Sequence, residues 1–78
     1  MSLVKRSLSI AGHRTSLALE AEFWEVIDVH IANGPHSFAG FIRAMDAARI
    51  ESGAPQNLAS YLRVWALKEA QKLSLIHI

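Results

Sequence analysis

Residues 13–20 alternate between two kinds of side chain along their whole length. Every second residue is apolar or carries a methyl group: Thr15, Leu17 and Leu19. The residues between them are Arg14, Ser16 and Ala18. An alternation of period two is typical of a β-strand with one buried face. We therefore predict a strand here, with the first set facing the core and the second set facing outward.

A single strand leaves its backbone N–H and C=O groups unpaired, so this segment needs a partner strand. No second segment gives a convincing strand signal, and we expect the partner to be the same strand of a second copy of the chain. Residues 7–10 also alternate and could pair locally as a hairpin through Ala11 and Gly12. A type I′ turn requires positive φ at both positions, for which Ala11 is poorly suited. We therefore expect residues 1–12 to form a basic N-terminal arm rather than part of a hairpin.

The size of the chain also favours association between copies. Its 78 residues allow one domain, and a domain this small buries only roughly 60% of its unfolded surface. It contains no cysteine that could form a disulfide. The hydrophobic content of 51% is high, and a dimer interface would account for it.

Positive charge is concentrated at the start of the chain although the net charge is only +1. Residues 1–19 contain Lys5, Arg6, His13 and Arg14 but no acidic residue. Such an asymmetry indicates a basic surface that the average conceals. No apolar run approaches the ~20 residues of a membrane-spanning helix, and no signal peptide is evident. We expect a cytoplasmic protein.

Three helices are predicted, over residues 21–32, 38–50 and 58–72. The first has apolar residues at the spacing of one helical face and ends at Asn33-Gly34, a C-terminal capping signal. Ser37 and Asn57 are the expected N-caps of the second and third helices. The third helix is apolar on more than one face, so we expect it to pack against other parts of the protein.

The last six residues, 73–78, have two interpretations. Their sequence Leu-Ser-Leu-Ile-His-Ile resembles one reading frame of a common sequencing adapter, which would make them a read-through artefact. The alternative is a native amphipathic tail. We favour the artefact.

The order of arm, strand, helix, glycine-containing turn and helix resembles the ribbon-helix-helix family. The resemblance covers residues 4–72, and its most specific part is the Gly-His-Arg-Thr-Ser block at 12–16 followed by Leu19-Glu20 and Phe23-Trp24. It implies a mainly α fold with one N-terminal β-strand, which pairs antiparallel across a homodimer, plus an extra C-terminal helix. The domain would span residues 13–72.

The resemblance also implies a function and a set of site residues. Members bind DNA as homodimers, with two dimers on adjacent half-sites, and insert the two-stranded ribbon into the major groove. The outward residues that would contact bases are Arg14, Ser16 and Ala18. The expected phosphate contacts are Lys5, Arg6, His13, Ser37 and Phe38. The expected dimer interface comprises Thr15, Leu17, Leu19, Phe41 and Ile42.

The chemistry of these side chains supports some of the roles more than others. The guanidinium group of Arg14 matches O6 and N7 of guanine, although it could instead pair with Glu20 or Glu22 on the surface. Ala18 can offer only a methyl contact, for example to thymine. The turn before residue 38 is also longer by a residue than is usual in the family, which weakens the prediction of phosphate contacts there.

Catalysis and metal binding are not expected. The four histidines, His13, His30, His36 and His77, are not spaced as a metal site on one helix, and no cofactor is expected. A chain of this size without a deep pocket is an improbable enzyme. The functional prediction is therefore a homodimeric transcriptional regulator that binds specific DNA.

The alternative is an antitoxin-like or adaptor module that binds another protein through residues 58–72. Tyr61, Trp65 and Leu67 would be its anchors, because exposed aromatic residues dominate many interfaces. Exposure of Trp65 would favour this alternative, and burial of Trp65 would weaken it.

Overall fold

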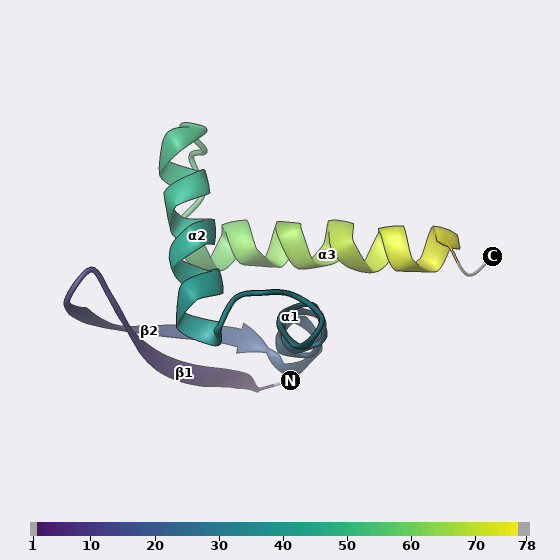
Figure 1. The fold of residues 1–78 in the computed structure, drawn as a ribbon, viewed down its shortest axis with the longest axis horizontal. Coiled ribbons are helices and arrows are strands. Elements are labelled where there is room, and N and C mark those ends of the chain that lie inside the picture. Colours follow the sequence, from purple (N-terminus) through teal and green to yellow (C-terminus); the bar gives the residue numbers. More distant parts are fainter. Residues whose placement is uncertain (1, 77–78) are drawn as a thin grey trace.

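Two antiparallel strands begin the chain and three helices follow them. The computed structural model describes the backbone of residues 2–76 and the side chains of residues 2–72. The elements are β1 (Leu3–Ile10), β2 (His13–Glu20), α1 (Ala21–Ala32), α2 (Phe38–Glu51) and α3 (Leu58–Ile76). The β1–β2 hairpin forms one side of the molecule and the helices lie on its other side (Figure 1). A mainly helical fold with an N-terminal strand region and an additional third helix was predicted and is confirmed.

The hairpin corrects two expectations about the N-terminus. Residues 3–10 form a strand rather than a basic arm, and β1 pairs with β2 of the same chain, where a second copy had been expected. The connecting turn has φ of 51° at Ala11 and 82° at Gly12, so both central residues have the positive φ that a type I′ turn requires. The unfavourable φ of Ala11 costs about 1–2 kcal/mol, which the pairing of eight residues on each strand outweighs.

The strain at Ala11 leads to a test of the turn. We expect Ala11→Asn to raise the free energy of unfolding by about 1 kcal/mol, because Asn tolerates positive φ and Asn-Gly favours type I′ turns. Gly12→Ala is the opposite control and should lower stability by a similar amount, since a Cβ there meets no atom within 4 Å and only φ opposes it. Urea unfolding followed by circular dichroism measures both. Equal stabilities of the unmodified protein, Ala11→Asn and Gly12→Ala would contradict a turn with positive φ at both positions.

The hydrophobic core lies between the hairpin and the helices. The hairpin contributes Leu8, Leu17 and Leu19, which are 6%, 6% and 0% exposed. The helices contribute Trp24, Ile27, Phe41, Ile42 and Leu62. All five elements therefore share one core, and α3 is part of it through Leu62. The set predicted to face the core from residues 15–19 does so, with Thr15 half-buried.

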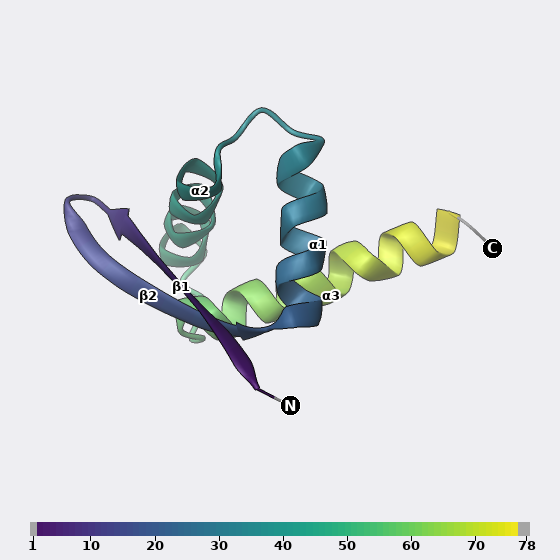
Figure 2. The same cartoon turned by 90° about the horizontal axis from the view of Figure 1, so that it is seen from below.

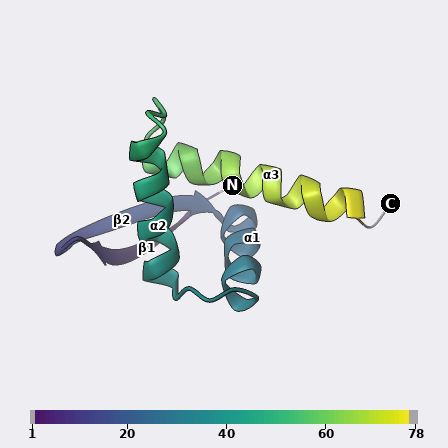
Figure 3. The same ribbon diagram turned by 45° about the horizontal axis from the view of Figure 1, so that its top comes forward.

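The three helices agree closely with the sequence prediction. α1 has the predicted bounds, α2 ends at Glu51 instead of Ile50, and α3 continues beyond residue 72 to Ile76. Residues 73–76 of the proposed tail thus extend α3, whereas residues 77–78 lie outside the described part of the chain. The last part of α3 projects beyond the rest of the molecule (Figure 3). None of the helices within residues 2–76 is long and apolar enough to cross a membrane.

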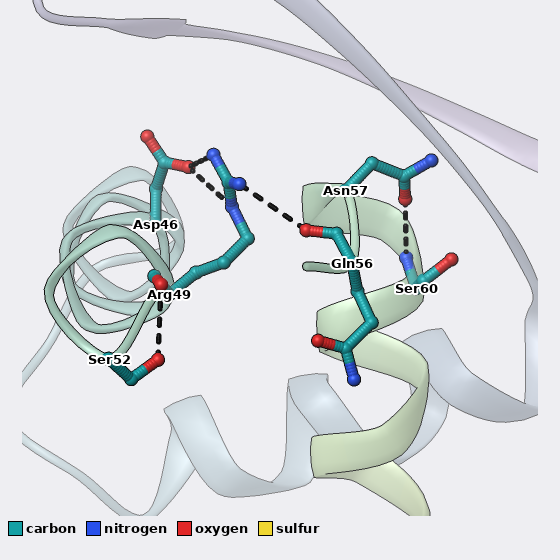
Figure 4. Close-up of polar contacts among 6 residues, drawn as sticks. All are labelled: Asp46, Arg49, Ser52, Gln56, Asn57 and Ser60. Atoms are coloured by element: carbon teal, nitrogen blue, oxygen red, sulfur yellow. Dashed lines mark hydrogen bonds and ion pairs between the residues drawn. The ribbon is translucent and has the colours of Figure 1, made fainter. Parts of the chain in front are cut away.

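Side-chain caps and a polar cluster determine where α2 and α3 begin and how they are joined. The Ser37 hydroxyl accepts a hydrogen bond from the Gly40 N–H, and Asn57 Oδ1 accepts one from the Ser60 N–H, as the predicted caps require. Between the helices, Arg49 donates to Asp46 Oδ1 and to the Gln56 backbone carbonyl (Figure 4). These contacts hold the loop that turns the chain from α2 into α3.

Candidate nucleic-acid interface

The outward face of the hairpin carries the residues predicted to contact bases. The antiparallel register places three outward pairs side by side: Lys5 with Ala18, Ser7 with Ser16, and Ser9 with Arg14. All of these residues are exposed except Ala18, which is half-buried. The hairpin lies in front of the helices when the molecule is seen from below (Figure 2). The outward face is therefore open to solvent.

Two cations lie at opposite ends of this outward face. Within residues 2–72, neither Lys5 nor Arg14 forms an ion pair. The surface pairing of Arg14 with Glu20 is not what the structure shows, because Glu20 pairs with Arg63 at 2.9 Å between Oε1 and Nε. Both cations thus remain available to an anionic or hydrogen-bonding partner.

Two serines occupy the centre of the outward face. The hydroxyls of Ser7 and Ser16 lie 3.3 Å apart, within hydrogen-bonding distance across the two strands. A hydroxyl both donates and accepts, so each serine keeps further capacity toward solvent. The centre of the face offers polar groups of either kind, flanked by positive charge. Such a surface is suited to the edges of base pairs in a groove.

Arg6 lies on the other face of the hairpin, which corrects its expected contact with phosphate. Its guanidinium group forms two hydrogen bonds to the carboxylate of Asp28, of 2.8 and 2.9 Å. The group also stacks over the ring of Trp24, at 4.5 Å from the ring centre, and lies 5.5 Å from that of Phe38. Alternation explains this position, because Arg6 lies between Lys5 and Ser7 and therefore faces the helices. Arg6 thus joins β1 to α1.

The other predicted phosphate contacts are more dispersed. His13 is exposed beside the hairpin turn. Ser37 already caps α2, and the ring of Phe38 packs 5.8 Å from that of Trp24 between ring centres. Their contacts with phosphate stay predictions. The expected dimer-interface residues Leu17, Leu19, Phe41 and Ile42 lie in the core of the single chain, and Thr15 is half-buried on the same face of β2.

Arg63 supports the end of the hairpin, a role that sequence analysis missed. Besides its ion pair with Glu20, its Nη2 donates to the backbone carbonyl of Ala18 at 3.3 Å. The hydrogen bond from Arg63 lowers the pKa of the Glu20 carboxyl below its usual range. Arg63 and Glu20 are 43 residues apart, and no local pattern signals such a pair. Through Arg63, α3 holds the part of β2 that carries the outward face.

The two ion pairs of the hairpin make its stability depend on pH. The Arg6 hydrogen bonds lower the pKa of Asp28, as those of Arg63 lower the pKa of Glu20. Carboxylates with a lowered folded-state pKa stabilise the protein above about pH 4 and lose this contribution as the pH falls through their folded pKa. We expect Asp28→Asn to make the decline in stability between pH 6 and pH 3 shallower, by less than about 1 kcal/mol because the pair is half-exposed.

Thermal unfolding at several pH values measures this effect. Arg6→Gln should also give a shallower profile, because it removes the partner that lowers the pKa of Asp28. Profiles of Asp28→Asn and the unmodified protein that run parallel between pH 6 and pH 3 would contradict the contribution of this pair.

The fold and the open outward face together point to one class of protein. An exposed two-stranded β-ribbon backed by helices is one of the arrangements with which proteins enter a DNA groove. A family model described as the ribbon-helix-helix domain matches residues 3–70, and the chain belongs to that family. Neither the comparison with curated proteins nor that with solved structures gives a match. The family match includes both strands, α1, α2 and most of α3.

Proposed function

We propose that this protein is a transcriptional regulator that binds specific DNA sequences through the outward face of the β1–β2 hairpin. The observation that carries the proposal is this face itself, which combines two cations with central serines. Within residues 2–72 neither cation forms an ion pair, and the hairpin lies in front of the helices in Figure 2. The family match supports DNA binding in general. We propose a binding function without catalysis.

The dimensions of the hairpin suit the major groove. Adjacent strands lie about 4.8 Å apart, and the major groove is about 12 Å wide and admits a two-stranded ribbon. In this arrangement Arg14 hydrogen-bonds to guanine, Ser16 contacts a base edge and Ala18 offers its methyl group. His13 and the start of α2 at Ser37 and Phe38 would then contact the flanking phosphates.

We further propose that the protein acts as a homodimer, with one hairpin in each of two half-sites. Several large apolar side chains remain exposed in the single chain, and association would cover part of them. They are Leu3, Val4, Val29, Ile50, Val64 and Leu67. Half-sites of a dimer lie about 34–36 Å apart, one turn of DNA. Sedimentation with and without DNA tests this stoichiometry.

Arg14→Ala tests base recognition directly. We expect this variant to bind a DNA site selected by the unmodified protein about 5- to 150-fold more weakly, since a bidentate contact to guanine contributes about 1–3 kcal/mol of discrimination. Binding to a scrambled duplex should change far less. The measurement is a fluorescence-anisotropy titration on both duplexes.

Arg43→Ala is the charge-matched control. Arg43 is exposed on α2, and its replacement by alanine also removes one positive charge. We expect Arg43→Ala to weaken binding to both duplexes by the same small amount. Equal losses on selected and scrambled DNA for Arg14→Ala would refute a base contact. A steep fall of log affinity with log salt is also expected, and no binding to any duplex at low salt would refute the proposed function.

Protein binding through α3 is the second candidate, and the structure weakens it. Trp65 is half-buried and packs edge-on against Phe41, with ring centres 5.0 Å apart, and against His30 at 4.9 Å. Tyr61 is half-buried, and only Leu67 of the three predicted anchors is exposed, at 53%. Trp65 thus belongs to the internal packing of α3 rather than to a free surface.

A further inference from the structure

A cavity of about 200 Å³, called the loop cavity below, is lined by the loop between α2 and α3 and by one face of α3. The lining residues are Ala54, Gln56, Tyr61, Val64, Trp65 and Lys68. None of these residues belongs to the hairpin. The loop cavity is therefore separate from the proposed DNA-binding face.

The polar groups of the loop cavity are not used by the protein itself. Within residues 2–72, the side chains of Tyr61, Trp65 and Lys68 form no hydrogen bond or ion pair. The side-chain amide of Gln56 forms none there either, and its Oε1 is buried. Figure 4 shows that the Gln56 backbone carbonyl accepts a hydrogen bond from Arg49, while the amide extends away from that contact. Buried polar atoms are nearly always hydrogen-bonded, so this amide is an exception that requires an explanation.

Two other cavities differ from the loop cavity in this respect. One, of about 270 Å³, lies beside β1 and α1, and its Arg6 and Asp28 already form an ion pair of 2.8 Å. Another, of about 250 Å³, lies beside α1 and α3, where His30 Nδ1 is 3.7 Å from Glu69 Oε1. Polar groups that already have partners attract a further molecule less. The loop cavity is therefore the better candidate for a ligand site.

The side chains of the loop cavity indicate the chemistry of a ligand. Among the lining residues, Lys68 is positively charged and none is acidic. The Lys68 ammonium, the Tyr61 hydroxyl and the Trp65 N–H are donors that suit the oxygens of a carboxylate. The two aromatic rings and Val64, which is 40% exposed, offer apolar surface beside these donors. The combination suits a molecule with an apolar body and an anionic group.

We propose that the loop cavity binds a small aromatic carboxylate, with the ring against Tyr61 and Trp65 and the carboxylate at Lys68. Pockets for drug-sized ligands have volumes of about 300–1,000 Å³, so a cavity of about 200 Å³ suits a single ring. The protein does not fix the Gln56 amide, and rotation about its terminal bond lets it donate to or accept from a ring substituent. The bound ligand joins the loop to α3. This inference does not depend on DNA binding.

An NMR titration with benzoate tests the proposal, because the two tryptophans of the chain act as internal reporters. Trp65 lines the loop cavity, whereas Trp24 is 2% exposed and its Nε1 donates to the Val4 carbonyl. We expect benzoate to shift the Nε1–H signal of Trp65 in a saturable manner and to leave that of Trp24 unchanged. Benzamide has nearly the same shape without the charge and should bind about 2- to 5-fold more weakly, since the Lys68 ammonium is exposed. Acetate, which lacks the ring, should cause no saturable shift.

Substitutions separate the charge of the loop cavity from its shape. Lys68→Ala should weaken benzoate binding about 2- to 5-fold and remove the difference between benzoate and benzamide. Lys72→Ala, one turn further along α3, removes a charge that does not line the cavity and should leave both affinities nearly unchanged. Ala54→Leu should abolish binding because the larger side chain occupies the cavity. Ala47→Leu, at an exposed position of α2, is its matched control, and circular dichroism checks the fold of each variant.

The contrary results are distinguishable, and each overturns the inference. Equal affinities of the unmodified protein for benzoate and benzamide would show an apolar cavity without preference for an anion. Acetate binding as tight as that of benzoate would show a nonspecific anion contact. An unshifted Trp65 signal, or a shift that persists in folded Ala54→Leu, would show that benzoate does not occupy the loop cavity. All of these results leave the proposed function unaffected, because none of them involves the hairpin.

Discussion

Replacement of Trp24 by alanine is expected to unfold most of the protein at room temperature. Trp24 is 2% exposed, and its Nε1 donates a hydrogen bond of 2.7 Å to the backbone carbonyl of Val4. Removal of a buried Trp side chain costs about 3–5 kcal/mol. A core this small rarely supplies more than about 3–5 kcal/mol in total. The loss therefore equals most of the stability available to the single chain.

A control substitution at an exposed position of α1 distinguishes the loss of the buried Trp24 side chain from a nonspecific effect of substitution in this helix. Val29→Ala is the matched control, because Val29 is 50% exposed on the same helix, and its effect should stay within about 0.5 kcal/mol. Trp24→Phe keeps an aromatic ring but removes the N–H donor, so we expect an intermediate loss. Urea unfolding monitored by far-ultraviolet circular dichroism compares the three. A cooperative, nearly unchanged transition for Trp24→Ala would contradict the contacts of this side chain.

Leu62→Ala is expected to give the second large loss, of about 2–5 kcal/mol in the free energy of unfolding. Leu62 is fully buried on α3, and Ala66, one turn later, is fully buried as well. α3 packs on α1, on α2 and on the end of β2, where Arg63 holds Glu20. Since these contacts join α3 to the common core, its loss should weaken the whole protein.

A comparison within α3 tests whether the helix is part of one cooperative unit. Leu67→Ala changes the same type of side chain at a position that is 53% exposed and should have little effect. For Leu62→Ala we expect circular dichroism and tryptophan fluorescence to report one transition, shifted to lower urea. Loss of part of the helical signal with the remaining transition unshifted would show that α3 is an appendage to the other four elements.

The local elements of this fold follow from short-range patterns. The alternation over residues 15–19 predicted β2 and its buried face, and the helical spacing with Asn33 predicted the full extent of α1. Ser37 and Asn57 predicted the starts of α2 and α3 because a capping side chain bonds to a backbone N–H only three residues away. The ribbon-helix-helix resemblance depended on these same features.

The sequence did not predict β1 because two local signals there oppose each other. Residues 7–10 alternate, which favours a strand, but Ala11 disfavours the type I′ turn that a hairpin needs. The structure shows that the pairing of eight residues per strand outweighs one unfavourable φ. The approximate repeat between residues 5–10 and 14–19 was the signal that would have indicated the second strand.

By itself, the sequence determined the positions of the helices, the outward placement of Arg14, Ser16 and Ala18, and the family. These properties depend on side chains within one or two turns of each other or on alternation along one strand. Only the tertiary structure decided that β1 is the partner of β2, that Arg6 faces Asp28 and Trp24, and that Arg63 supports the hairpin. Such contacts join residues 18 or more positions apart or depend on the total energy of a strand pair. Local propensity contains neither kind of information.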